Sequence, residues 1–204
     1  MSPPALLLLG SNYALVMSLP VIFFEKRDER LGPMWWVNAV PFILLPPALL
    51  LAGLGVLPPL FAYGSAVAEL LATAAVVPSA VSIGLVAAAL ATHRVPLAQW
   101  HQREDRPGSI VTHGPYARVR HPFYLAYLLL FLAAAMTAPG VATLGLLAYA
   151  ALALNHTAAR EERHLCASIL GAAYRAYMVR TGRFIPVRAG TARWLSGPEL
   201  GGRP

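Results

Sequence analysis

Two short stretches in the second half of the sequence carry side chains suited to holding a charged small molecule. His121-Pro122 stands in the first, and two adjacent glutamates, Glu161 and Glu162, stand in the second. Because proline fits the first position of a helix and restricts the residue before it, His121-Pro122 predicts a turn followed by a new helix N-terminus. Free N–H groups and the positive end of the helix dipole make such a start suitable for an anion such as a carboxylate.

A plain structural interpretation of the first stretch is open as well. Arg118 and Arg120 could be anchors at a membrane interface, and Tyr116 and Tyr124 could belong to its aromatic belt. The residues alone leave both interpretations standing.

Helical spacing separates the two glutamates. Glu162 heads a mostly apolar stripe formed by Cys166, Ile169, Ala173 and Tyr177. Adjacent glutamates at the foot of a membrane helix often form only a solvated cap, which is the better interpretation for Glu161. We therefore predict that Glu162 points into a pocket and is the functional carboxylate.

The elements that position these residues are membrane helices. The 204 residues are 57% hydrophobic and 12% charged, whereas about 25% charged residues is usual in a soluble domain. A spanning helix needs roughly 20 apolar residues. Five segments meet or approach this length: residues 4–24, 34–54, 65–92, 122–138 and 141–155. The fold class is therefore all-α integral membrane with about five transmembrane helices.

The last two segments are separated only by Pro139-Gly140, which predicts a tight helical hairpin. Residues 158–180 then remain compatible with a helix but are polar, which predicts a cytoplasmic amphipathic helix after the last span. We divide the chain into an N-terminal three-helix region (1–92), a cofactor-binding region (93–186) and a loose tail (187–204).

The basic residues predict the topology. All 16, of which 15 are arginine, fall between segments one and two, between three and four, or after segment five. The positive-inside rule makes that side cytoplasmic, with the N-terminus outside and the C-terminus inside. Because topology accounts for the arginines, a nucleic-acid partner is not expected. The chain has one cysteine and no cysteine–histidine cluster, so we expect no disulfide and no metal site.

An ordered set of short motifs carries a family resemblance. The set consists of Gly-Pro-Tyr (114–116), Arg-His-Pro-x-Tyr (120–124), the hairpin, Glu-Glu (161–162), Gly-x-x-Tyr-x-x-Tyr (171–177) and a closing proline at 186. Together they resemble the isoprenylcysteine carboxyl methyltransferase family. That family belongs to a wider group of membrane methyltransferases that includes the phospholipid N-methyltransferases. The resemblance covers roughly residues 99–186.

The resemblance implies S-adenosylmethionine as cofactor, bound at the cytoplasmic end of the C-terminal half. Carried over by motif, the cofactor-binding residues would be Gln99, Gly108, Ser109, Ile110, Val111, Tyr116, His121, Pro122, Phe123, Tyr124 and Glu162. Gln102 is an alternative to Gln99. In this assignment the helix start at His121-Pro122 holds the cofactor carboxylate, and Glu162 pairs with its ammonium group. Tyrosine faces near the sulfonium would be favourable through cation–π attraction.

The methyl acceptor stays open. It could be the carboxylate of a prenylcysteine-like compound, a phospholipid amine or a small thiol, reaching the site from the lipid bilayer. No catalytic residue is assigned. The family places a substrate arginine where this chain has Thr157-Ala158, and the nearest candidate is Arg160. The Ala-, Arg-, Pro- and Gly-rich composition suggests a bacterial inner membrane protein, where protein prenylation is not expected.

Two other functions remain open. The first is an NADPH-dependent membrane reductase of the sterol-reductase type, which shares a similar Arg-His-Pro-x-Tyr element. The second is a non-catalytic membrane protein that retains the fold.

Overall fold

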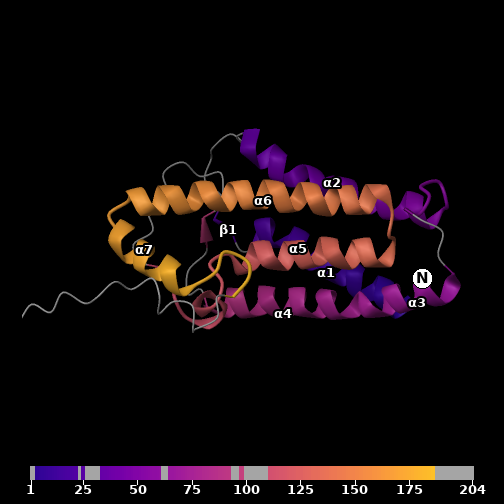
Figure 1. Ribbon diagram of the computed structural model, residues 1–204, viewed down its shortest axis with the longest axis horizontal. Helices are drawn as coiled ribbons and strands as arrows, with labels where there is room; N and C mark the ends of the chain where they lie inside the picture. Colours follow the sequence, from indigo (N-terminus) through magenta and orange to yellow (C-terminus); the bar gives the residue numbers. More distant parts are fainter. Residues whose placement is uncertain are drawn as a thin grey trace, which may run out of the picture.

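A computed structural model of the chain describes residues 3–22, 24–25, 33–60, 64–92, 97–98 and 110–186. Most of these residues are helical, and the long helices run side by side along one axis (Figure 1). In chain order the elements are α1 (Pro3–Ile22), β1 (Phe24–Glu25), α2 (Pro33–Gly53), α3 (Ser65–Ala74), α4 (Val76–Thr92), β2 (Leu97–Ala98), the 3-10 helix η1 (Gly114–Ala117), α5 (Pro122–Thr137), α6 (Val141–Ala167) and α7 (Gly171–Arg180). The two short strands pair in parallel.

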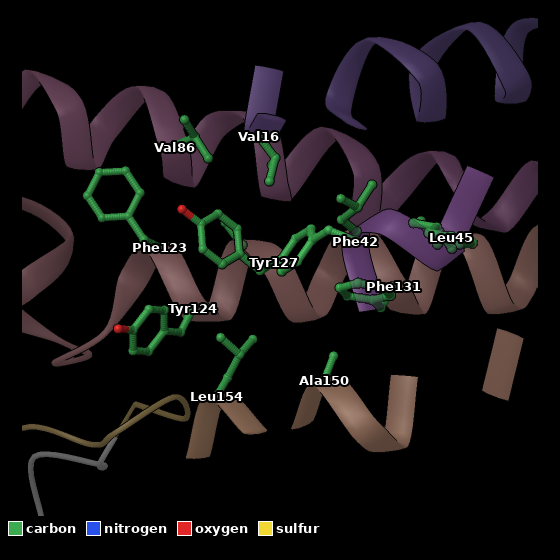
Figure 2. Close-up of a cluster of buried hydrophobic side chains, with 14 of the residues drawn as sticks. Val16, Phe42, Leu45, Val86, Phe123, Tyr124, Tyr127, Phe131, Ala150 and Leu154 are labelled. Carbon is green, nitrogen blue, oxygen red and sulfur yellow. The ribbon is translucent and has the colours of Figure 1, made fainter. Parts of the chain in front are cut away.

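Helix α5 is the centre of the bundle. It packs against α1, α3, α4 and α6, while α2 lies along α6. Its residues Ala126, Leu130 and Phe131 are fully buried. Figure 2 shows Tyr127 and Phe131 of α5 beside Phe42 of α2, whose ring meets both of them edge to face. The bundle therefore supports a helix that is too short to span a membrane by itself.

The chain is an integral membrane protein. Three described helical stretches are long and apolar enough to cross a bilayer, namely Trp35–Gly53, Ser65–Thr92 and Val141–Ala167. Two further apolar helices, Ala5–Leu19 and Pro122–Thr137, are shorter. The sequence predicts about five spans. In the described part of the chain, the structure has three helices of full spanning length and two shorter apolar ones. Helix α2 continues through Pro41, Pro46 and Pro47, as membrane helices tolerate.

The predicted end of the last spanning helix was wrong. Helix α6 does not stop at residue 155 but continues through both glutamates to Ala167, and the chain breaks only at Ser168. The polar residues after 155 stay helical because one face of α6 remains packed: the buried Thr157 hydroxyl donates to Asn38 Oδ1 of α2 at 3.1 Å. The stripe predicted beyond Glu162 is also wrong, since Ile169 lies in the break and is 95% exposed.

The joint between α6 and α7 depends on Gly171. A Cβ atom at this position would lie 2.2 Å from the carbonyl oxygen of Cys166, which is backbone and cannot move aside cheaply. We expect Gly171→Ala to cost about 1–3 kcal/mol, as overpacking does, and to weaken ligand binding at the neighbouring site. Thermal unfolding of the purified protein measures the first effect. Gly145→Ala is the matched control, because its Cβ would meet nothing within 4 Å. Equal melting temperatures for both variants would contradict the prediction.

Candidate functional site

The predicted helix start at Pro122 is confirmed. Helix α5 begins there, with His121 as the residue before it. The backbone of this turn is tied to the segment after α7: Arg120 N–H donates to Gly182 O at 2.8 Å, and Gly182 N–H donates to Arg118 O at 3.2 Å. His121 N–H donates to Arg183 O at 3.2 Å. Residues about 60 positions apart in the sequence are thereby held side by side.

Glu162 lies at the centre of a charged cluster at this place. It is 3% exposed. Arg183 binds it with two donors, Nη2 to Oε2 at 2.6 Å and Nε to Oε1 at 3.1 Å. Arg120 Nε donates to Oε1 at 2.9 Å, and His121 Nε2 lies 3.3 Å from the same oxygen. The prediction that Glu162 points inward therefore agrees with its burial, and its carboxylate is engaged by two guanidinium groups.

Glu161 is not the solvated cap that we predicted. The Tyr124 hydroxyl donates to its Oε1 at 2.5 Å, and His121 Nδ1 lies 3.4 Å from its Oε2. The two glutamates therefore face the two ring nitrogens of His121. The imidazole also stacks on Tyr124, with ring centroids 5.3 Å apart and planes 2° from parallel. Figure 2 shows Tyr124 at the end of the buried cluster that leads from the bundle core.

Arg120 joins this cluster to α7. Its Nη1 donates to the carbonyl oxygens of Met178 and Thr181 at the C-terminal end of that helix. A cation is favourable there because the last carbonyls of a helix lack partners and carry the negative end of the dipole. Arg120 is thus not an anchor at the membrane interface, since its side chain is only 10% exposed. Arg118, two residues earlier, is exposed.

The electrostatics of the surrounding groups follow from this arrangement. Hydrogen bonds to Glu162 raise the pKa of Arg183, so its guanidinium stays charged at any physiological pH. Burial raises the pKa of Tyr116 and of Tyr177, so both phenols are neutral. The Tyr177 hydroxyl donates to Tyr116 O at 2.7 Å and fastens α7 to η1.

A groove of about 450 Å³ opens beside Glu162, between α6 and the end of α7. This volume lies within the range of small-molecule sites. Glu162, Arg163 and Arg183 are its charged walls, and Cys166 and Met178 are among its less polar ones. A ligand in this groove would reach the carboxylate and the guanidinium of the central ion pair together.

The structure brings together only some of the predicted cofactor-binding residues. His121 contacts both Glu162 and Tyr124. Pro122 and Phe123 are buried in the first turn of α5. Tyr116 is half-buried in η1, and Ile110 and Val111 precede it in a half-buried stretch without regular secondary structure. Gln99, Gln102, Gly108 and Ser109 lie outside the described residues. Arg160 is exposed on α6 and has no ion pair among the described residues.

Sequence reasoning missed two residues of the cluster, Arg120 and Arg183. Arg120 opens the Arg-His-Pro-x-Tyr motif, and Arg183 lies three residues before the closing proline of the motif set at 186. Their side chains reach a carboxylate 42 and 21 positions away, respectively. The sequence signal that could have found them is their positive charge, which a buried glutamate needs as a partner. Among the described residues, no group of three or more His, Cys, Asp or Glu could hold a metal ion.

Comparison with known families gives a match to the region that contains the cluster. Residues 72–172 match the family model described as phospholipid methyltransferase. This region is similar to that family. It contains α4, α5, α6 and the cluster residues Arg120, His121, Glu161 and Glu162, whereas Arg183 lies beyond it. The match agrees with the membrane methyltransferase group indicated by the motifs. No curated protein matches the chain.

Proposed function

We propose that the chain is an S-adenosylmethionine-dependent integral membrane methyltransferase, with its cofactor bound where His121 meets Glu162. The observation that carries this proposal is the buried Glu162 carboxylate at the edge of a ligand-sized groove, beside the first turn of α5. The family match supports methyl transfer as the reaction class. S-adenosylmethionine supplies a methyl group on a sulfonium, and the protein's part is to bind it, align it and exclude water.

The donor set suits both ends of the methionine portion of this cofactor. A carboxylate side chain suits the ammonium group, and the guanidiniums and helix start suit the carboxylate. Two arginine donors already occupy Oε1 of Glu162, with His121 Nε2 beside them, and a third arginine donor occupies Oε2. We therefore propose that Arg183 exchanges Glu162 for the cofactor carboxylate. Arg183 is the more accessible partner, because its side chain is 30% exposed while that of Arg120 is 10% exposed.

The acceptor that we propose is small or lipophilic and enters from the bilayer. A phospholipid amine stands first because of the family match, ahead of a prenylcysteine-like carboxylate or a thiol. On the basis of the positive-inside rule, we propose that this end of the bundle faces the cytoplasm, in a bacterial inner membrane with the N-terminus outside.

A cofactor titration of the purified full-length protein tests the proposal. By calorimetry, we expect S-adenosylhomocysteine to bind with saturation and NADPH to show no binding. Binding of NADPH in place of S-adenosylhomocysteine would mean a reductase, and binding of neither would mean a non-catalytic protein. Transfer of a labelled methyl group to phosphatidylethanolamine, compared with a prenylcysteine analogue and a thiol, then selects the acceptor.

A further inference from the structure

The end of the bundle opposite the glutamate cluster carries a single acidic side chain, Glu69. Between residues 31 and 93 the sequence has no other Asp, Glu, Lys or Arg, and between 121 and 159 it has none at all. Glu69 lies on α3, the fifth residue of the apolar stretch Ser65–Thr92. Ionisable residues in membrane helices are costly and commonly mark a functional site. Glu69 is exposed in this structure, so its carboxylate is open to a charged ligand.

Glu69 lines a cavity of about 550 Å³. The end of α2, the connection that follows it, the start of α3 and the turn between α5 and α6 form its walls. In Figure 1 these elements gather at the right, at the far end from α7. The cavity is therefore separate from the groove at Glu162, and both fall within the size range of small-molecule sites.

The connections around this cavity hold one another in place. Leu60 N–H donates to Pro139 O at 3.0 Å, and Pro59 and Gly140 form an isolated bridge. A Cβ atom on Gly140 would lie 3.2 Å from Pro58 O, so the two backbones approach closely. The Thr143 hydroxyl donates to Ala138 O at 2.5 Å. These contacts join the two connections into one rim, which preforms the cavity.

The lining selects the kind of ligand. The hydroxyls of Thr137 and Thr143 already donate to backbone carbonyls of their own helix or turn. Among the described residues of the lining, Glu69 is the only charged one, and apolar side chains such as Leu57 and Ala142 form much of the rest. A calcium ion needs about 6–8 oxygen ligands, which one carboxylate does not supply. A cation with an apolar body matches this lining.

We propose that this cavity is a second binding site, which takes an organic ammonium group paired with Glu69. The ammonium could belong to a lipid headgroup or to a soluble amine, since both present the same charge. The proposal does not depend on the identity of the cofactor at Glu162.

Calorimetry with choline tests the proposal on the purified full-length protein in a non-ionic detergent. We expect saturable binding of choline and none of 3,3-dimethylbutanol, which has nearly the same shape without the charge. Glu69→Gln should weaken choline binding at least about tenfold, because it removes the counter-charge. Equal binding of choline and dimethylbutanol, or unchanged affinity in the Glu69→Gln variant, would overturn the proposal.

A second pair of variants separates the cavity from the charge. Ala142→Leu places bulk in the cavity and should also reduce choline affinity, whereas Ala148→Leu adds the same volume at an exposed position of α6. S-adenosylhomocysteine affinity should stay unchanged in all three variants. In nanodiscs, competition by phosphatidylethanolamine but not phosphatidylglycerol identifies a lipid ligand, and competition by neither identifies a soluble amine. Choline binding that survives Ala142→Leu unchanged would place the ligand elsewhere and overturn the proposal.

Discussion

The Glu162→Gln variant is expected to lose S-adenosylhomocysteine binding and methyl transfer while it still inserts and folds. The amide keeps the shape of the side chain but removes the charge that Arg120, Arg183 and an incoming ammonium group all need. Truncating one partner of a buried charge pair costs about 2–5 kcal/mol of binding, and each 1.4 kcal/mol is a factor of ten. We therefore expect affinity to fall at least thirtyfold, measured by calorimetry.

Glu69→Gln is the matched control for this experiment. It removes one carboxylate in the same way, from a helix at the other end of the bundle. Its cofactor affinity should equal that of the unmodified protein. Should Glu162→Gln fail to fold, Glu162→Asp keeps the charge and withdraws it by one methylene, and we expect reduced affinity there too. Unchanged cofactor affinity in a folded Glu162→Gln protein would remove Glu162 from the proposed site.

Features governed by neighbouring residues could be predicted from the sequence. The start of α5 is fixed by Pro122 and its effect on His121, and the structure has it at that residue. The apolar character of the long helices follows from composition, and so does their membrane location. Of the two glutamates, Glu162 is the buried one, as predicted. That success did not depend on the stripe behind it, because the helix ends at Ala167, before the stripe is complete.

Features that depend on contacts between distant residues could not be predicted. The length of α6 is an example: Thr157 looks polar in the sequence, but Asn38, 119 positions away, satisfies its hydroxyl inside the bundle. Glu161 looked like a surface cap for the same reason, since Tyr124 and His121 reach it from another helix. The sequence shows that a polar side chain will need a hydrogen-bond partner if it is buried. Which distant group is that partner depends on how the helices pack.

Arg120→Met should be the most destabilising substitution at the site. The planar guanidinium of Arg120 binds Glu162 of α6 and the last carbonyls of α7 at the same time. Neither methionine nor lysine has several donors fixed in one plane, so neither can replace it. Breaking a buried ion pair by removing one partner costs about 3–5 kcal/mol. We expect the lower end of that range because Arg183 remains on Glu162. Thermal unfolding in detergent measures the loss.

The behaviour of α7 distinguishes the loss of this particular ion pair from the general effect of losing one positive charge. Arg118→Met removes an equal charge two residues away, from an exposed side chain, and should leave stability within about 0.5 kcal/mol of the unmodified protein, as surface substitutions do. Amide hydrogen exchange should speed up in α7 and the segment after it in Arg120→Met, but not in Arg118→Met. If both variants unfold and exchange alike, the arginine does not fasten α7. The groove beside Glu162 would then owe its shape to Gly171 and Tyr177, which tie α7 to α6 and η1 without charge.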